Sequence, residues 1–436
     1  MPATISAIKF MRKCHMHRFF YTLLLYVILP FVPLKLLWRG IKQPEYRKHW
    51  GERLGFYPPL PPQTKPIICL HCVSVGETRA AAPLVHKLKT QFPHHQILLT
   101  HATPTGRETG QQLFGESVMR VYLPYDVPFA VQRFLRHFQP CMVLLMETEI
   151  WFNLISACKK NAIPCLLINA RLSEKSARGY QKLGRLITSA LTGLSQIAAQ
   201  TNADADRFSL LGAAMPQVTG NLKFEFNVPD GTRAKGEALR QLIGDNTFVF
   251  VAASTRDGEE TLLLDALNAH NIPNLVTIIV PRHPQRFNEV ENLLKARKIK
   301  FAKRSTLTMP LASDTHLILG DSMGELLLYY AASDVAFVGG SLLPFGGQNL
   351  IEPCALGKPV LIGAHTFNFE LATTNANQVG AAIQVENADI LVEKLAELAA
   401  APALRQKMSE AGLQFVAENQ GATEKTLHII QQHLTN

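Results

Sequence analysis

The 436-residue sequence contains only seven cysteines, an odd number for so long a chain. No small-residue cleavage site follows its apolar N-terminal stretch, so neither a removed signal peptide nor a disulfide framework is expected. Cys69 and Cys72 form a Cys-x-x-Cys pair within the apolar run "PIICLHCV". Because a strand sends residues three apart to opposite faces, joint metal ligation or redox pairing by these thiols is disfavoured. We interpret both as core or near-core thiols of a protein in a reducing compartment.

Metal-binding and low-complexity signatures are also missing. The sequence has no acidic or histidine cluster with convincing metal-ligand spacing, so we expect no metal and no other cofactor. It has no low-complexity tract and 47% of its residues are hydrophobic, so the chain should fold. At roughly 100–200 residues per domain, the length predicts two domains with additional segments.

Acidic residues are too few to balance the basic ones. The chain has 44 Lys and Arg against 34 Asp and Glu, for a formal net charge of +10 at pH 7. An excess of positive charge indicates anionic partners, which include nucleic acid, phosphorylated metabolites and an acidic membrane surface. The charge by itself does not choose among them.

One run near the N-terminus, Phe19 to Leu34, carries no charge at all. Basic residues flank it, namely Lys9, Arg12, Lys13 and Arg18 before it and Lys35, Arg39, Lys42, Arg47 and Lys48 after it. The run is shorter than the ~20 residues of a comfortable membrane span, and Pro30 and Pro33 would kink it. A retained anchor with Trp38 at the interface and an oblique interfacial helix both remain open. The basic residues after the run place the body of the protein in the cytoplasm.

Beyond the N-terminal segment, apolar runs alternate with helical patterns in two series. The first series is "PIICLHCV", "QILLTHAT", "VMRVYLPYD", "CMVLLMETEIW", "PCLLINARL" and "SQIAAQTN", and the second is "TFVFVAAS", "LVTIIVPRH", "IKFAKRS", "THLILGDS", "DVAFVGGS" and "PVLIGA". Strands that are apolar throughout and separated by helices indicate parallel sheets covered on both faces. We predict an α/β protein with two doubly wound, Rossmann-like domains facing a cleft.

The same pattern predicts the domain boundaries. Residues 1–45 form a membrane anchor with a basic flank, 46–222 the first domain, 223–235 a linker and 236–436 the second domain. The C-terminal helices of the second domain can cross back to the first. In open α/β sheets, ligands bind outside the carboxyl ends of the strands, so functional residues are expected there.

A carboxylate follows the first strand in "LHCVSVGETRAAAPLV". Ser74 and Glu77 have the spacing of a capping box, and a first-turn glutamate is favoured by the helix dipole. Glu77 also stands at the edge of the sheet where ligands bind. The second half repeats this opening in "FVAASTRDGEETLLLDAL". A capping role and a functional role therefore both remain open for Glu77.

The stretch from Asp334 to Ala364, "DVAFVGGSLLPFGGQNLIEPCALGKPVLIGA", is rich in glycine directly after a strand. We expect a helix to start at Gln348-Asn349, where glycines let backbone amides approach a phosphate and the dipole favours an anion. Glu352 would then be placed for the hydroxyls of a ribose. Arg282 in "VPRHPQRF" comes at the end of a second strand, and a helix start at Met323 to Glu325 follows a third. Each of these residues could have a structural role only, but together they predict a nucleotide-donor domain.

The motifs "HCVSVGET", "LPYD", "METEIW", "NARLSEKSARGY", "VTGNLKF", "VPRHPQRF", "GDSMGELLLYY", "FVGGSL", "GGQNLIEPCALGKPV" and "HTFNF" occur in this order along the chain. Through these ordered motifs, nearly the whole chain resembles the bacterial 3-deoxy-D-manno-octulosonic acid (Kdo) transferases of lipid A and lipopolysaccharide biosynthesis. The resemblance implies a GT-B fold and inverting transfer of Kdo from CMP-Kdo to a lipid A precursor. It also implies a location at the cytoplasmic face of the bacterial inner membrane.

The resemblance assigns roles to individual residues. Glu77 would be the general base, and Glu147 and Glu149 the paired acids on the acceptor side. The donor turns would comprise Ser254, Thr255, Pro281, Arg282, Met323, Gly324, Glu325, Gly346, Gly347, Asn349 and Glu352. Three positions depart from the family: Arg256 and Gln348 where it usually has His, and Phe152 where it usually has Pro. Arg and Gln can still donate hydrogen bonds to an anion.

A basic helix is expected over Glu174 to Leu194, "EKSARGYQKLGRLITSALTGL". Arg178 and Lys182 on it are assigned to the acceptor side, where they can face a phosphorylated acceptor and the inner leaflet. The alternative is a solvated helix whose other face is core. The anionic partners CMP-Kdo, lipid A precursor and membrane account for the +10 without nucleic acid. Another nucleotide-sugar transferase or epimerase, and a non-catalytic membrane-tethered nucleotide-binding protein, remain as alternative functions.

Overall fold

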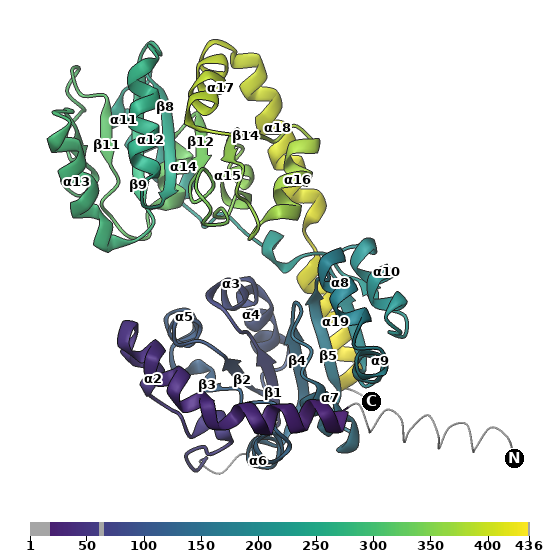
Figure 1. The fold of residues 1–436 in the computed structure, drawn as a ribbon. Coiled ribbons are helices and arrows are strands. Elements are labelled where there is room, and N and C mark those ends of the chain that lie inside the picture. Colours follow the sequence, from purple (N-terminus) through teal and green to yellow (C-terminus); the bar gives the residue numbers. More distant parts are fainter. Residues whose placement is uncertain (1–17, 61–64, 435–436) are drawn as a thin grey trace, which may run out of the picture. The chain divides into compact units, whose positions relative to one another are not determined.

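The computed structural model of the chain describes residues 18–60 and 65–434 (Figure 1). It divides into two compact units, Met1–Glu225 with Gln420–Asn436, and Phe226–Asn419. The division after Glu225 lies within residues 223–235, the predicted linker, although the helix α11 (Thr232–Ile243) begins there. The last 17 residues group with the first unit rather than with the second.

The first unit is built on a seven-stranded sheet in which all strand pairs are parallel. Its strands are β1 (Ile67–His71), β2 (Gln96–His101), β3 (Met119–Tyr122), β4 (Pro140–Met146), β5 (Cys165–Ala170), β6 (Gln196–Ala199) and β7 (Gln217–Val218). Their spatial order is β3-β2-β1-β4-β5-β6-β7. Each predicted apolar run of the first half contains one strand. The runs do not predict β7, which has only two exposed residues at the sheet edge.

Helices cover both faces of this sheet (Figure 1). They are α3 (Val75–Ala80), α4 (Ala82–Gln91), α5 (Pro104–Phe114), α6 (Pro128–Phe138), α7 (Phe152–Lys160), α8 (Glu174–Gln181), α9 (Arg185–Leu191), α10 (Asn202–Leu210) and α19 (Ala422–Leu434). One core cluster joins the sheet to α6, α7 and α9, and another joins it to α4 and α19. Cys69 belongs to the first cluster and Cys72 to the second, and both thiols are free and buried. The prediction that they lie on opposite faces is confirmed.

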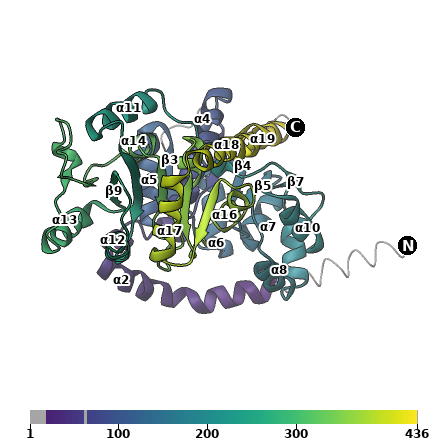
Figure 2. The same ribbon diagram turned by 90° about the horizontal axis from the view of Figure 1, so that it is seen from above.

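A helix of 24 residues, Arg18–Ile41, precedes the sheet and lies along the surface of the first unit (Figures 1 and 2). It is long and apolar enough to cross a membrane, with a mean hydropathy of 1.9 in its most apolar stretch. Pro30 lies in the short 3-10 turn η1 (Leu29–Phe31), and α2 (Val32–Lys42) continues from it. The prolines tighten the helix locally without ending it. The basic residues expected before it, Lys9, Arg12 and Lys13, lie outside the described residues.

The second unit is a second parallel seven-stranded sheet. Its strands are β8 (Phe248–Thr255), β9 (Leu275–Pro281), β10 (Ala302–Lys303), β11 (Leu317–Leu319), β12 (Val335–Val338), β13 (Val360–Gly363) and β14 (Ala382–Val385), in the order β10-β11-β9-β8-β12-β13-β14. The helices around it are α11, α12 (Glu259–Ala269), α13 (Phe287–Ala296), α14 (Leu326–Ala332), α15 (Ile351–Ala355), α16 (Glu370–Gln378), α17 (Ala388–Ala400) and α18 (Pro402–Asn419). Two doubly wound, Rossmann-like units are thus confirmed.

The expected basic helix Glu174–Leu194 is wrong as a single element. It divides into α8 and α9, and the chain between them turns at Gly184, which has φ 51°. A left-handed conformation is easiest for glycine and interrupts the helical hydrogen bonds. Arg178 and Lys182 therefore lie on a different helix segment from the buried residues of α9.

The helix starts expected in the second unit also differ. The helix α15 begins at Ile351 rather than at Gln348-Asn349, because Gly346 and Gly347 have φ 95° and 73° and keep the chain in a turn. Asn349 precedes the helix, and its side-chain oxygen accepts a hydrogen bond from the Ile351 amide. The five residues of α15 make a weak dipole, so an anion at this turn would depend on the turn amides instead.

The helix start expected at Met323 to Glu325 falls slightly later as well. The helix α14 begins at Leu326, with Glu325 at the N-cap position. Gly324 has φ 79° and belongs to the preceding turn. The three residues therefore form a connection from β11 to α14 rather than the first turn of the helix.

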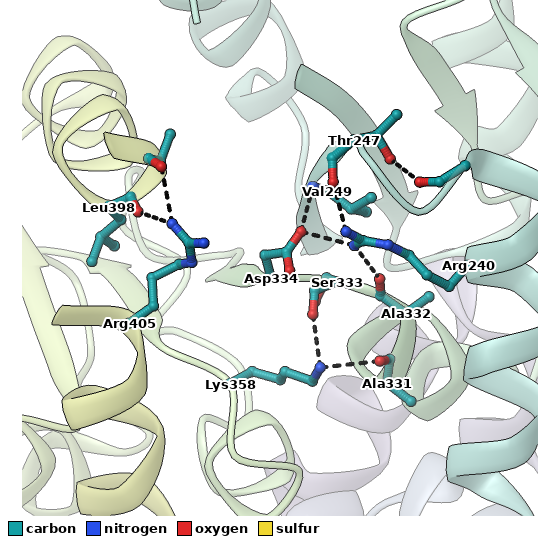
Figure 3. Close-up of polar contacts among 12 residues, drawn as sticks. Arg240, Thr247, Val249, Ala331, Ala332, Ser333, Asp334, Lys358, Leu398 and Arg405 are labelled. Atoms are coloured by element: carbon teal, nitrogen blue, oxygen red, sulfur yellow. Dashed lines mark hydrogen bonds and ion pairs between the residues drawn. The ribbon is translucent and has the colours of Figure 1, made fainter. Parts of the chain in front are cut away.

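The amino ends of the strands in the second unit carry a closed polar network (Figure 3). Arg240 donates to Asp334 at 2.8 Å. Burial lowers the pKa of Lys358, and its ammonium group donates to the carbonyl oxygens of Ala331 and Ser333 at 3.0 and 2.8 Å. These groups satisfy one another at the edge opposite the predicted donor turns, so their role is structural.

Candidate functional site

Glu77 lies in the first turn of α3, directly after β1. The Ser74 hydroxyl accepts a hydrogen bond from the Glu77 amide at 3.3 Å, which confirms the predicted cap. The carboxylate of Glu77 reaches back one residue further than a standard capping box and accepts from the Val73 amide at 2.7 Å. Its side chain is nearly buried, with 9% of the residue exposed. The capping role is therefore present, and it occupies only part of the carboxylate.

Two more acidic residues follow β4, the strand next to β1. Glu147 has the unusual φ of 54° and its carboxylate lies 3.4 Å from the Lys223 ammonium. Glu149 accepts from the Trp151 indole at 2.8 Å and lies 4.0 Å from the ring of His71. Because β1 and β4 are parallel neighbours, their carboxyl ends bring these acids to the edge that carries Glu77.

This grouping of acids changes their proton affinity. Burial raises the pKa of Glu77 to about 7, and the negative charge of Glu147 adds to this more than that of Glu149. The Val73 amide opposes the shift by stabilising the charged form. Burial also raises the pKa of Glu149, and it lowers the pKa of His71 to about 3 so that the imidazole is neutral. The edge thus holds a carboxyl group that exchanges its proton near neutral pH.

The helix α8 lies next to the loop that carries these acids. The hydroxyl of Tyr180 donates to the carbonyl of Thr148 at 3.4 Å, which attaches α8 to this loop. Arg178 is largely exposed and lies 3.6 Å from Glu174, one helical turn away. Lys182 is exposed at the C-terminal end of α8. Both cations are available to solvent beside the loop.

Asp126 is a further polar residue at this edge that pattern reasoning does not single out. It is buried and accepts hydrogen bonds from the amides of Asn153 and Leu154, at 2.9 and 2.8 Å, where α7 begins. It also accepts from the hydroxyl of Tyr21 on the N-terminal helix at 3.0 Å. Burial raises its pKa to about 6. Only its place in the motif "LPYD" marks it in the sequence.

In the second unit, the predicted donor residues lie at the carboxyl ends of β8 and β9 or follow β9, β11 and β12, and these four strands are neighbours in the sheet. Ser254 has φ 57°, and the Thr255 carbonyl accepts from the Arg282 amide at 3.0 Å. A side chain at Gly339 would come within 2.8 Å of the backbone of Ser254, so glycine is required where β12 ends. Pro281 is the last residue of β9. The expected shared edge is confirmed.

Two of the three positions that depart from the family pattern, Arg256 and Gln348, lie here, whereas Phe152 begins α7 in the first unit. The Arg282 guanidinium donates to the side-chain oxygen of Gln348 at 3.2 Å. Arg256 lies 3.1 Å from the His283 ring and packs over Phe345 at 4.7 Å from the ring centre. Within the described residues, no carboxylate lies within 4.0 Å of Arg256. The half-buried Arg256 therefore presents its positive charge at this turn.

Glu259 is the second-half counterpart of Glu77 and has a different role. Fully buried, it accepts hydrogen bonds from four backbone amides, those of Arg256, Gly340, Ser341 and Leu342, at 2.6–2.9 Å. It therefore fixes the glycine turn after β12 to the turn after β8. The repeated Gly-Glu sequence reveals the position, but only the long-range amides reveal this structural role.

The remaining predicted donor residues divide between partnered and exposed side chains. Glu325 accepts from Arg304 at 2.9 Å and from Ser322. Glu352 accepts from the side-chain amide of Asn349 at 3.0 Å. Met323 is 64% exposed. The Asn349–Glu352 pair is thus assembled at the edge, whereas Glu325 is bonded to Ser322 in its own turn and to Arg304 after β10.

Within residues 18–60 and 65–434, no group of three or more His, Cys, Asp or Glu side chains is arranged to hold a metal ion. The acidic pair Asp204 and Asp206 lies at the start of α10. There Asp204 accepts from the Leu172 amide at 2.8 Å and from the Thr201 hydroxyl at 2.6 Å. Its contacts are those of a structural helix start.

Comparisons with known proteins identify the family. Residues 48–226 match the model of the 3-deoxy-D-manno-octulosonic-acid transferases (kdotransferases), and 243–415 match that of the glycosyl transferases group 1. A 3-deoxy-D-manno-octulosonic acid transferase of Haemophilus influenzae is 40% identical over 96% of this chain and 99% of its own length. One from Bordetella pertussis is 42% identical over 84% of this chain and 87% of its own length.

The fold agrees with this similarity. The crystal structure of a glycosyltransferase from Rickettsia africae has a TM-score of 0.56 and covers 86% of this chain and 100% of its own. At 18% identity this likeness concerns the fold alone. The two doubly wound units have the expected GT-B type. The chain therefore belongs to the 3-deoxy-D-manno-octulosonic acid (Kdo) transferases, which are glycosyltransferases.

Proposed function

We propose that this protein transfers Kdo from CMP-Kdo to a lipid A precursor of the lipid IVA type, with inversion and with Glu77 as the general base. The reaction belongs to lipopolysaccharide biosynthesis and takes place at the cytoplasmic face of the inner membrane, where the N-terminal helix holds the enzyme. Membership of the Kdo transferase family supports the sugar that is transferred. The observation that carries the proposed chemistry is the pKa of Glu77, which burial and Glu147 raise to about 7.

A carboxylate with this pKa is suited to general base catalysis. A sugar hydroxyl is a poor nucleophile, and a positioned base with a pKa near the working pH contributes about 10²–10⁴-fold. One oxygen of Glu77 accepts the short hydrogen bond from the Val73 amide, while the other has only the longer contact, 3.3 Å, with the Ser74 hydroxyl. This second oxygen keeps a lone pair for the acceptor hydroxyl.

The proposed step balances without a metal. The acceptor oxygen forms a bond to the anomeric carbon of Kdo on the side opposite the phosphate, and its proton passes to Glu77. The bond between the anomeric carbon and the phosphate oxygen breaks, and CMP leaves with that electron pair. Cationic and amide donors at the phosphate stabilise the charge that develops.

The second unit supplies groups suited to the donor. Arg256 and Arg282 stand at the ends of β8 and β9 and can bind the phosphate or the carboxylate of CMP-Kdo. The turn amides after β12, which Glu259 holds in place, add uncharged donors. Glu352, beside Asn349, can accept hydrogen bonds from ribose hydroxyls.

The first unit supplies groups suited to the acceptor. Glu147 and Glu149 lie beside Glu77 and can orient sugar hydroxyls, while Arg178 and Lys182 can bind the acceptor phosphates. Both cations are exposed beside the loop that carries the acids, which suits a charged and bulky acceptor.

A donor comparison tests this function. The purified full-length protein is incubated with a tetraacylated lipid A precursor and either CMP-Kdo or UDP-sugars, and the products are analysed by mass spectrometry. We expect Kdo addition from CMP-Kdo alone. Transfer or epimerisation with a UDP-sugar would favour the alternative enzymes, and CMP-Kdo binding without any product would favour the non-catalytic alternative.

A further inference from the structure

The N-terminal helix contacts the first unit along one continuous stripe. The residues of this stripe are buried or half-buried and recur at helical spacing: Arg18, Tyr21, Thr22, Leu25, Leu29, Val32, Leu36 and Gly40. Steps of three and four residues place side chains on one face of a helix. The stripe extends over the length of the 24-residue helix, which lies along the surface of the first unit (Figures 1 and 2).

Specific contacts hold this stripe. The Tyr21 hydroxyl donates to Asp126 at 3.0 Å, and its ring packs edge-on against Phe152 at 4.9 Å. Thr22 and Asn153 exchange side-chain hydrogen bonds at 3.1–3.2 Å. Toward the far end of the helix, Leu36 is buried and Gly40 lies against the side chain of Arg47. The first turns of the N-terminal helix are thus held by both polar and apolar contacts.

The opposite face is apolar and exposed. Its large hydrophobic residues are 46–71% exposed: Phe19, Phe20, Leu23, Leu24, Val27, Ile28, Phe31, Leu34, Leu37, Trp38 and Ile41. Tyr26 borders this face and stacks on Phe129 of α6. No acidic residue occurs between Arg18 and Gln43, while Lys35 and Arg39 are exposed beside the apolar face. Soluble surfaces rarely expose a continuous apolar strip of this kind, and basic flanks favour anionic lipid.

A membrane-spanning orientation conflicts with these contacts. The uncharged run from Phe19 to Leu34 measures only about 24 Å as a helix, against about 30 Å of hydrocarbon. A spanning helix would have to leave the stripe, and the buried carboxylate of Asp126 would lose its Tyr21 partner. If it kept the stripe, Asp126 and Asn153 would be carried into lipid, which is costly for polar groups.

We propose that the N-terminal helix lies in the plane of the membrane surface, with its exposed face among anionic lipids and its other face bound to the first unit. This rests on the membrane location proposed above. The contacts of the helix are with residues that follow β3 and β4, including Asp126 and Phe152. Glu149 follows β4 as well, in the loop that leads into Phe152. The lipid surface therefore lies beside the acidic edge, where a lipid-borne acceptor arrives.

Adjacent photo-crosslinking positions on opposite faces of the helix test this orientation. Leu24 and Phe31 are on the exposed face, and their neighbours Leu25 and Val32 are on the stripe. Each is replaced in turn by p-benzoylphenylalanine in the full-length protein, bound to vesicles of phosphatidylethanolamine and phosphatidylglycerol. We expect lipid adducts at 24 and 31, at least about tenfold more than at 25 and 32, where adducts form within the protein. Equal lipid adducts at all four positions would show a spanning helix and overturn the proposal.

A charge substitution provides an independent measurement. Phe31→Glu should weaken binding to the same vesicles by about tenfold or more, whereas Leu210→Glu, at an 87% exposed position on α10, should not. Equal binding by both variants would contradict the in-plane face. Kdo transfer to detergent-dispersed acceptor is measured on all proteins. If Kdo transfer persists while the adducts indicate a spanning helix, only the in-plane orientation is wrong. If the unmodified protein has no transfer activity, the proposed function is wrong instead.

Discussion

Glu147 raises the pKa of Glu77 from the end of a neighbouring strand. The two residues follow β4 and β1, which pair in parallel with His71 opposite Leu145. Glu147 is held there by the left-handed backbone at φ 54° and by Lys223 at 3.4 Å. Burial contributes most to the raised pKa of the proposed base, and the charge of a residue that is distant in the sequence and adjacent in the sheet adds to it.

Replacing the proposed base should remove catalysis and spare binding. Glu77→Gln keeps the shape and can still accept from the Val73 amide, but it cannot take a proton. We expect kcat to fall about 10²–10⁴-fold with little change in the affinity for CMP. Steady-state kinetics and calorimetric titration with CMP measure the two effects, with Glu174→Gln, an exposed position on α8, as the control. Retention of most turnover would leave Glu77 with its capping role only.

The pH dependence of transfer should report the carboxylate cluster. Because the ionised form of Glu77 is the active one, kcat/KM should rise with pH through about 7 and then level off. Glu147→Gln removes the larger of the two repulsive charges and should move this rise to lower pH. Glu149→Gln should move it less. Profiles of the three proteins that superimpose would contradict the coupling.

The same shift predicts how stability depends on pH. Because the pKa of Glu77 is raised from 4.5 to about 7 on folding, the folded protein binds more protons than the unfolded chain between these values. The free energy of unfolding therefore falls, through this group, as pH rises from about 4.5 to about 7. At pH 8, Glu77→Gln should be more stable than the wild type by on the order of 1–3 kcal/mol, and the difference should vanish below about pH 4.5.

Urea unfolding of both proteins between pH 4 and 8 provides this comparison, with Glu174→Gln as the control for a charge that is already solvated. A constant difference between Glu77→Gln and the wild type across this range would contradict the raised pKa. A larger difference at low pH than at high pH would mean that folding lowers the pKa of Glu77 instead of raising it.

The donor turn makes a separate prediction. Glu352→Ala should weaken binding of CMP and raise the KM for CMP-Kdo, since each hydrogen bond from a ribose hydroxyl to a charged acceptor is worth about 1.5–3 kcal/mol. Glu370→Ala, at the start of α16, is a matched acidic control. Calorimetric titrations with CMP that gave the same affinity for Glu352→Ala and the wild type would place Glu352 outside the donor site.

The sequence by itself determined the elements that depend on neighbours along the chain. Apolar runs predicted twelve of the strands because a buried parallel strand is apolar throughout. The spacing of Ser74 and Glu77 predicted the helix cap, and the Cys69–Cys72 spacing predicted opposite faces. Prediction from the sequence failed where glycines interrupt a helical pattern. Gly184 divides the basic helix, and Gly346 and Gly347 delay the start of α15.

Only the tertiary structure decided what each acid does. The two Gly-Glu turns have similar sequences, yet Glu259 accepts hydrogen bonds from four backbone amides, three of them from the distant turn after β12. Glu77, in contrast, keeps one oxygen with a single long contact. The N-terminal run likewise does not show which side of its helix contacts the protein, whereas the structure places Tyr21 against Asp126 and Thr22 against Asn153. Local periodicity records which face of an element is apolar, but the order of strands and the partners of a buried charge arise from contacts between segments far apart in the sequence.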